Sequence, residues 1–155
     1  ISYRLVGSEM CIRDRYESGA ILEYLLAKYD TGNFHPNKDD ETFPYYLQWL
    51  HYAEGSIMPQ VNTIVVETIL LPPERKNEVN VARAFKLLNV ALINVNNNLE
   101  NKDFLTGKFS GADIMTGHAC IGAKRVGADI SNMSNISNYI ERLMSRPALQ
   151  KAMKI

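Results

Sequence analysis

Residues 109–114 read Phe-Ser-Gly-Ala-Asp-Ile, and this stretch predicts the start of the helix around which the chain is organised. Ser110 and Asp113 have the spacing of an N-cap residue and its N3 partner, so each side chain can bond to the backbone N–H of the other. Phe109 and Ile114 stand at N′ and N4, where two apolar side chains can form a hydrophobic staple. Such a cap contributes about 1–2 kcal/mol to stability. It is a folding feature, and we assign it no chemistry.

Small residues follow the cap, and they would let neighbouring helices approach closely. Ile114, His118 and Ile121 recur at helical spacing after it. The small residues among them are Ala112, Gly117, Ala119, Gly122 and Ala123. We therefore expect the central helix of an all-helical core.

Apolar residues recur three and four positions apart in most of the remaining chain, which is the pattern of helices that pack on one face. The expected helices cover about residues 17–29, 40–71, 74–98, 134–144 and 147–153. Pro59 lies inside the second of these and should kink or split it. The sequence thus predicts an all-α fold, a bundle of five to six helices preceded by one further helix and a polar linker.

The composition argues against several classes of partner. Lys plus Arg and Asp plus Glu number 17 each in 155 residues, so the formal net charge is zero, which disfavours a nucleic acid or an anionic membrane as the main partner. No apolar run is long enough for a transmembrane helix. The cysteines are Cys11 and Cys120, which indicates a reducing compartment, and we expect Cys120 to be an inert buried thiol. His35 and His51 lack the spacing of metal ligands, so no metal is expected.

Residues 1–15 read as foreign to the rest of the chain. The run GSEMCIRDR at 7–15 resembles the translation of a sequencing-library adapter. We therefore expect a non-native segment here, a missing native N-terminal part, and no reactive-thiol role for Cys11. The alternative is a native strand at residues 3–6 followed by a loop.

Four stretches, in this order, resemble a soluble bacterial glutathione S-transferase. They are ESGAILEYL at 17–25, QWLHYAEGSIMP at 48–59, FSGADI at 109–114 and RPA at 146–148. The resemblance covers residues 16–155 and implies a thioredoxin-like N-terminal domain followed by an all-helical C-terminal domain. It divides the chain into the adapter-like segment (1–15), the last helix of a truncated thioredoxin-like domain (16–30), a linker (31–40) and a helical domain of the glutathione transferase C-terminal type (41–155).

Glu17 and Ser18 are the glutathione-binding residues that the resemblance implies. The γ-glutamyl end of glutathione carries an ammonium and a carboxylate. Glu17 can pair with the ammonium, while the Ser18 hydroxyl and the N–H groups at a helix start can bind the carboxylate. The alternative is that both residues only cap the helix, with Ser18 as the N-cap.

The catalytic residue of the family is not expected in this sequence. In the resembled family, a Tyr, Ser or Cys near the start of the thioredoxin-like domain activates the thiol of glutathione, and a cis-proline presents backbone groups to its cysteinyl part. That region does not precede Glu17 here, and the first proline is Pro36. We assign no catalytic residue and expect the chain as written to be inactive. Glutathione would be the co-substrate of the parent enzyme, with no other cofactor.

Three residues are candidates for the wall of a pocket that holds a small hydrophobic electrophile. Tyr52 and Met58 lie in the long helix that faces the active site in the resembled fold, and His118 lies in the capped helix. Aromatic, Met and lone His residues at helical spacing are also common in cores, so a core role is the alternative. Trp49 is expected in the core.

The resemblance implies a truncated cytoplasmic glutathione transferase whose intact form conjugates or reduces small electrophiles with glutathione. It also implies a homodimer, formed through the helix that starts at Ser18 and the first two helices of the C-terminal domain. The rival interpretation is a non-catalytic helical domain of the same type that serves as a binding or assembly module. A third is an unrelated helical bundle with a fortuitous Glu-Ser helix start.

Overall fold

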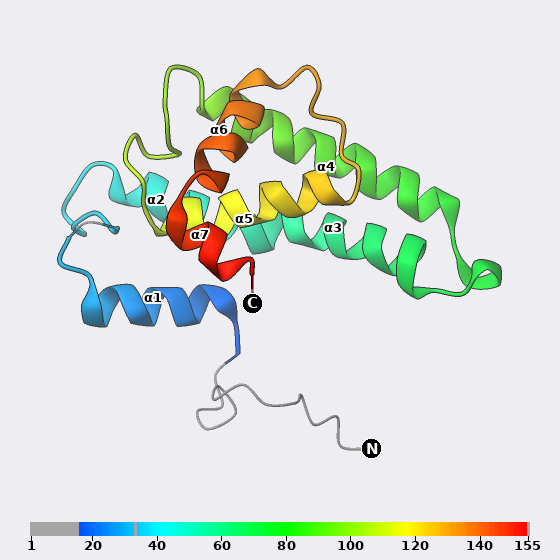
Figure 1. Cartoon of the computed structure of the whole chain (residues 1–155), viewed down its shortest axis with the longest axis horizontal. Coiled ribbons are helices and arrows are strands. Elements are labelled where there is room, and N and C mark those ends of the chain that lie inside the picture. The colour runs from blue at the N-terminus through cyan, green and yellow to red at the C-terminus, as the bar shows by residue number, and fades with distance from the viewer. Residues whose placement is uncertain (1–15, 33, 155) are drawn as a thin grey trace.

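The computed structural model describes residues 16–32 and 34–154, and within these ranges the chain consists of helices and loops. The predicted all-α fold is confirmed. The adapter interpretation of residues 1–15, Cys11 included, lies outside the described residues. Figure 1 shows the first helix, α1 (Ser18–Tyr29), beneath a bundle formed by the later helices.

The bundle is built from helices of very different length. In chain order they are α2 (Phe43–Tyr52), the π-helical segment η2 (Ala53–Ile57), α3 (Met58–Val65), the π-helical segment η3 (Val66–Leu70), the 3-10 turn η4 (Pro73–Arg75), α4 (Glu78–Asn98), α5 (Gly111–Arg125), α6 (Ser134–Met144) and α7 (Pro147–Ala152). Pro147 begins the last helix, as predicted.

The predicted capping box opens α5. Asp113 Oδ2 accepts the backbone N–H of Ser110 at 2.8 Å and its hydroxyl at 3.2 Å. Oδ1 accepts the N–H of Leu105 at 3.0 Å and the hydroxyl of Tyr139 at 2.9 Å. Asp113 is only 1% exposed, and burial raises the pKa of its carboxyl group. The carboxylate therefore joins the preceding loop and α6 to the start of α5, beyond the two-residue cap that the sequence predicted.

Glycines in α5 allow its neighbours to approach closely. A Cβ at Gly111 would lie 2.7 Å from Leu26 Cδ1 and 2.8 Å from the Tyr46 hydroxyl, and a Cβ at Gly117 would collide with side chains of α6. Gly122 faces open space. The prediction of close approach is therefore confirmed at Gly117 and wrong at Gly122, and the close approach at Gly111 was not predicted.

Pro59 splits the long helix, as predicted. α2 passes into η2, and α3 begins at Met58. Because proline has no N–H, it cannot donate the i→i−4 bond of an α-helix. A π turn lies just before it, in which the Met58 N–H bonds to the Ala53 carbonyl, five residues earlier. The helix begins at Phe43 instead of near Asp40, since the Asp40 carboxylate accepts the N–H and hydroxyl of Thr42 in a turn.

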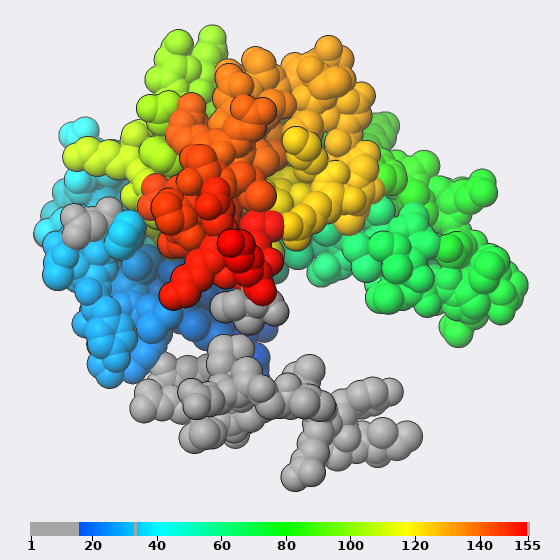
Figure 2. Space-filling view, in the orientation of Figure 1, coloured from blue at the N-terminus to red at the C-terminus, as the bar shows by residue number. Residues whose placement is uncertain are grey.

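Glu67 closes the hairpin between α3 and α4. Its carboxylate accepts the N–H of Asn77 and the side-chain amide of Asn80, each at 2.8 Å. The bonds from Asn80 and Asn77 lower the pKa of Glu67. Asn77 in turn caps α4, so this helix begins at Glu78 and not at 74–76. Figure 2 shows the hairpin projecting at the right of the molecule.

α1 is attached to the bundle through few side chains. Leu26 is buried and Leu22 packs against the core, but Leu25 and Tyr29 of the same predicted stripe are 45% and 63% exposed. Glu23 adds an ion pair of 3.3 Å to His51 of α2 when that histidine is protonated. The outer half of the apolar stripe on α1 is therefore not covered by the residues that the structure describes.

A backbone hydrogen bond attaches the linker to α5 at Phe34. Its carbonyl accepts the N–H of Gly111, the first residue of α5, at 2.7 Å. Phe109, which the sequence pairs with Ile114, packs edge-on against Phe34 and Phe104, with ring centroids 5.9 and 5.5 Å apart. The linker thus helps to hold the start of the central helix.

Candidate functional site

Glu17 and Ser18 lie at the exposed N-terminus of α1. Glu17 has φ 71° and ψ 97°, a conformation that costs a residue with a side chain roughly 1–3 kcal/mol. Ser18 is the first helical residue and Glu17 takes the N-cap position, so the alternative in which Ser18 caps the helix is wrong. Neither side chain caps α1, and both are exposed.

The first turn of α1 offers backbone donors beside these two side chains. The first intrahelical bond runs from Ile21 to the Glu17 carbonyl at 3.0 Å, which leaves the N–H groups of Ser18, Gly19 and Ala20 outside the helical ladder. Within residues 16–32 and 34–154, no oxygen accepts these three donors. A helix start of this kind carries partial positive charge and can bind a carboxylate.

Tyr52 and Met58 are half-buried on the helix pair α2–α3. The Tyr52 hydroxyl faces α4: it donates to the Ala91 carbonyl at 3.4 Å and accepts from the Asn94 side chain at 3.1 Å. Met58 packs against the core. Neither is among the described residues that line the cavity beside His118, so the structure does not bring the three candidates together.

His118 is exposed on α5 and lines a cavity of about 330 Å³ between α5 and α7. The core alternative for His118 is therefore wrong. The wall is largely apolar and includes Phe109, Ile121, Leu143 and Leu149. In Figure 2, residues of α6 and α7 cover the centre of this face of the molecule.

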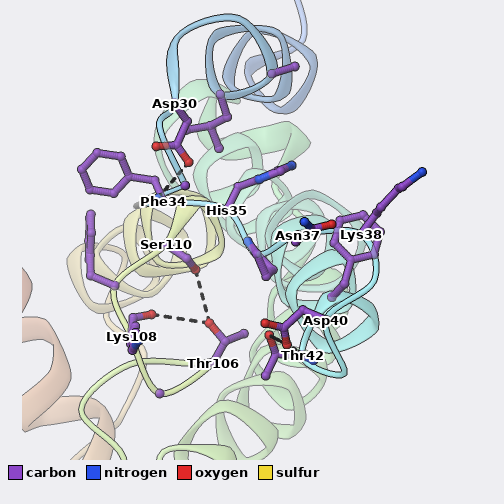
Figure 3. Close-up of a pocket in the computed structure, with 17 residues that line it drawn as sticks. Asp30, Phe34, His35, Asn37, Lys38, Asp40, Thr42, Thr106, Lys108 and Ser110 are labelled. Carbon is purple, nitrogen blue, oxygen red and sulfur yellow. Dashed lines mark hydrogen bonds between the residues drawn. The ribbon is translucent and has the colours of Figure 1, made fainter.

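A larger cleft, of about 960 Å³, lies between the linker and the loop before α5 (Figure 3). Its polar groups are largely engaged with one another. Asp30 accepts the N–H of Phe34 at 2.9 Å, and the bonds from Thr42, together with the nearby charge of Lys108, lower the pKa of Asp40. The predicted glutathione- and electrophile-binding residues do not line this cleft, and we assign it no role.

Trp49 and Cys120 are buried, as predicted. Burial raises the pKa of the Cys120 thiol to about 12, so it is no nucleophile at neutral pH. In the described part of the chain, no group of three His, Cys, Asp or Glu side chains is placed to hold a metal ion. No helix there combines the length and apolarity that crossing a membrane requires.

The fold is that of the helical domain of glutathione transferases. The sequence itself matches no family model and no curated protein. A glutathione transferase from Methylococcus capsulatus has a TM-score of 0.77 at 26% identity, over 90% of this chain and 66% of that one. A glutathione transferase from Burkholderia graminis, with two glutathione molecules bound per subunit, gives 0.76 at 27%, over 88% and 58%.

A fungal structure shares the fold as well. Ure2p5 from Phanerochaete chrysosporium, cocrystallised with 1-(S-glutathionyl)-2,4-dinitrobenzene, has a TM-score of 0.80 at 22% identity, over 90% of this chain and 67% of that one. The chain therefore spans 58–67% of the length of these three proteins.

Two residues of interest were missed by the sequence analysis. Phe34 holds the linker to α5, and the Arg146 guanidinium lies 3.5 Å from the centroid of the Phe109 ring. Arg146 was noted only as part of a motif before Pro147. Both contacts join residues far apart in the sequence, and no local periodicity or spacing signals them.

Proposed function

We propose that this chain is the helical part of a cytoplasmic, homodimeric glutathione transferase that conjugates or reduces small hydrophobic electrophiles. The observation that carries the proposal is the start of α1. Glu17, Ser18 and three N–H donors that have no acceptor among the described residues lie together there, on a fold shared with glutathione transferases crystallised with glutathione.

Each end of the γ-glutamyl group meets a matching partner in this proposal. The carboxylate accepts from the Ser18 hydroxyl and from the N–H groups of the first turn, and no hydrogen bond to a described residue has to break first. The ammonium pairs with the exposed carboxylate of Glu17. The positive φ of Glu17 fits this role, because strained backbone is found where surrounding structure fixes a side chain for binding.

The electrophile-binding residues remain candidates. His118 lines a cavity, and Met58 begins α3 at the junction with η2. The Tyr52 hydroxyl is hydrogen-bonded to Ala91 of α4, so only the Tyr52 ring could contact a substrate. We assign no thiol-activating group to this chain. We therefore expect it to bind glutathione without catalysing conjugation.

Calorimetric titration with glutathione tests this assignment. We expect Glu17→Gln and Ser18→Ala each to weaken binding on the order of tenfold, because each removes a charge-assisted bond. Glu54→Gln is the matched control, since Glu54 is exposed on η2, and should bind as the unmodified chain does. Equal affinity in all four proteins would refute the assignment. No binding at all would favour the assembly-module interpretation.

Conjugation of glutathione to a chloronitrobenzene is the complementary assay. The expected rate with the purified chain equals the uncatalysed rate. Turnover above that background would show that the chain activates the thiol itself, contrary to the proposal.

A further inference from the structure

Four large apolar side chains are exposed at the hairpin tip, by which we mean residues 66–79, where the chain turns from α3 into α4. Ile69, Leu70 and Val79 are 69%, 67% and 76% exposed, and Val66 is exposed as well. Val66, Ile69 and Leu70 belong to η3, and Val79 lies in the first turn of α4. Apolar side chains gathered in one place on a surface mark a site for a protein or a membrane.

Three hydrogen bonds tie the two arms of the hairpin tip together. The buried carboxylate of Glu67 accepts from the backbone of Asn77 and from the side chain of Asn80. Lys76 Nζ donates to the backbone carbonyl of Thr68. The tip is therefore held in one conformation before any partner binds, so little conformational freedom is lost on binding.

The shape of the hairpin tip favours a membrane as the partner. In Figure 1 the turn between α3 and α4 lies beyond the other helices, and in Figure 2 it projects from the side of the molecule. A protein partner would need a concave surface that matches this projection. A fluid bilayer needs no such match, because its lipids rearrange around an apolar group that enters the boundary between headgroups and acyl chains.

The charges of the hairpin tip indicate which lipids it fits. Its exposed charged residues are Glu74, Arg75, Lys76 and Glu78, two of each sign. No carboxylate in residues 16–32 or 34–154 is within ion-pair distance of Arg75 or Lys76. The two cations can meet lipid phosphates, and the two carboxylates can lie beside the ammonium groups of the same headgroups. This balance matches a lipid that carries both charges, such as phosphatidylcholine.

We propose that the hairpin tip binds a zwitterionic phospholipid membrane, with Ile69, Leu70 and Val79 inserted at the boundary between headgroups and acyl chains. Arg75 and Lys76 lie at the level of the phosphates. The insertion is shallow and reversible, because it involves a few side chains and no membrane-spanning helix. The site includes neither Glu17 nor Ser18 and requires no glutathione. It goes beyond the proposed function, and either can fail without the other.

Co-sedimentation of the full chain with phosphatidylcholine vesicles, without glutathione, tests the proposal. We expect the unmodified chain to partition onto the vesicles. Replacing both Ile69→Ser and Leu70→Ser should lower the partition coefficient on the order of tenfold, because the apolar area that leaves water is lost. Val79→Ser should lower it as well. Val90→Ser is the matched control and should partition as the unmodified chain does, since Val90 is also exposed on α4 but lies about 16 Å further along the helix.

Quenching of tryptophan fluorescence locates the inserted residues. Trp49 is the single tryptophan of the chain and is buried in the core, so it adds little quenching of its own. Leu70→Trp should be quenched by phosphatidylcholine brominated on its acyl chains, whereas Val90→Trp should not.

Four results would overturn the proposal. They are no partition of the unmodified chain, an equal loss in Val90→Ser and in the Ile69/Leu70 double variant, no quenching of Leu70→Trp, and partition that appears only when the vesicles contain the anionic lipid phosphatidylglycerol. Sedimentation velocity without vesicles provides a further check. A change of oligomeric state in the double variant would show that the hairpin tip is an interface between copies of the chain, contrary to the proposal.

Discussion

Asp113 joins three parts of the fold through one carboxylate. Its acceptors hold the start of α5, the preceding loop at Leu105 and the α6 residue Tyr139. Asp113→Ala would leave these buried donors without an acceptor, and unsatisfied groups of this kind cost about 1–3 kcal/mol each. We expect the free energy of unfolding in urea to fall by about 3–5 kcal/mol.

An exposed aspartate provides the control for this variant. Asp39→Asn should change the unfolding free energy by no more than about 0.5 kcal/mol, because Asp39 is exposed in the linker. A loss below about 1 kcal/mol for Asp113→Ala would mean that the carboxylate acts only as an ordinary helix cap.

For single residues, the sequence predicted only interactions between residues that are close together in the chain. The Ser110–Asp113 spacing predicted the cap because both partners lie within one helical turn. The bond from Tyr139 joins residues 26 positions apart, and the strain at Glu17 is set by how α1 enters the fold. The residues next to Asp113 and Glu17 in the sequence do not indicate this bond or this strain, so neither could be predicted.

Two glycines on α5 offer a matched test at the scale of the helices. Gly117→Ala places a methyl group against α6, and we expect it to lower stability by about 1–3 kcal/mol. Gly122→Ala meets no neighbour and should raise stability by about 0.5–1 kcal/mol, because alanine favours the helix. Thermal unfolding of the two variants should shift in opposite directions. A shift of the same sign would contradict the packing of α5 on α6.

The hairpin between α3 and α4 should loosen in acid. Hydrogen bonds hold the pKa of Glu67 below its ordinary 4.5, so the ionised group stabilises the fold above that value. This contribution is lost as the pH falls through the lower, folded-state pKa. The protection of the Asn77 and Asn80 backbone amides, measured as the exchange rate relative to the intrinsic rate at the same pH, should therefore fall in that range.

Glu67→Gln provides the comparison for this pH effect. The variant should exchange these amides faster at neutral pH and lose the acid dependence, because the glutamine does not titrate. An unchanged acid dependence in Glu67→Gln would assign the effect to another group.

Helices were easier to predict than their ends. Periodicity over many residues located α4, and the missing N–H of Pro59 predicted the break before α3. The starts of α2 and α4 were placed too early, because turns made by Asp40 and Asn77 hold the chain outside the helix there. Residues 40–42 and 74–77 are polar, so the spacing of apolar residues does not show where each helix begins.

For the whole molecule, the all-α fold could be predicted from the pattern of residues alone. The glutathione-binding residues could be predicted only from the resemblance to glutathione transferases. Short-range periodicity and small residues suffice to predict an all-α bundle. The residues of a site come together from distant segments, as Phe34, Phe109 and Arg146 do beside the cavity. The exposed Leu25 and Tyr29 of α1 are consistent with the homodimer that we propose through this helix.

The central claim is that the start of α1 recognises the γ-glutamyl end of glutathione. An NMR titration of the backbone amides with γ-glutamylcysteine tests it most directly, with cysteinylglycine as the comparison. The account predicts that γ-glutamylcysteine shifts Ser18, Gly19 and Ala20 and that cysteinylglycine leaves them unchanged. Shifts of equal size with both dipeptides, or no shift in these three residues, would contradict it.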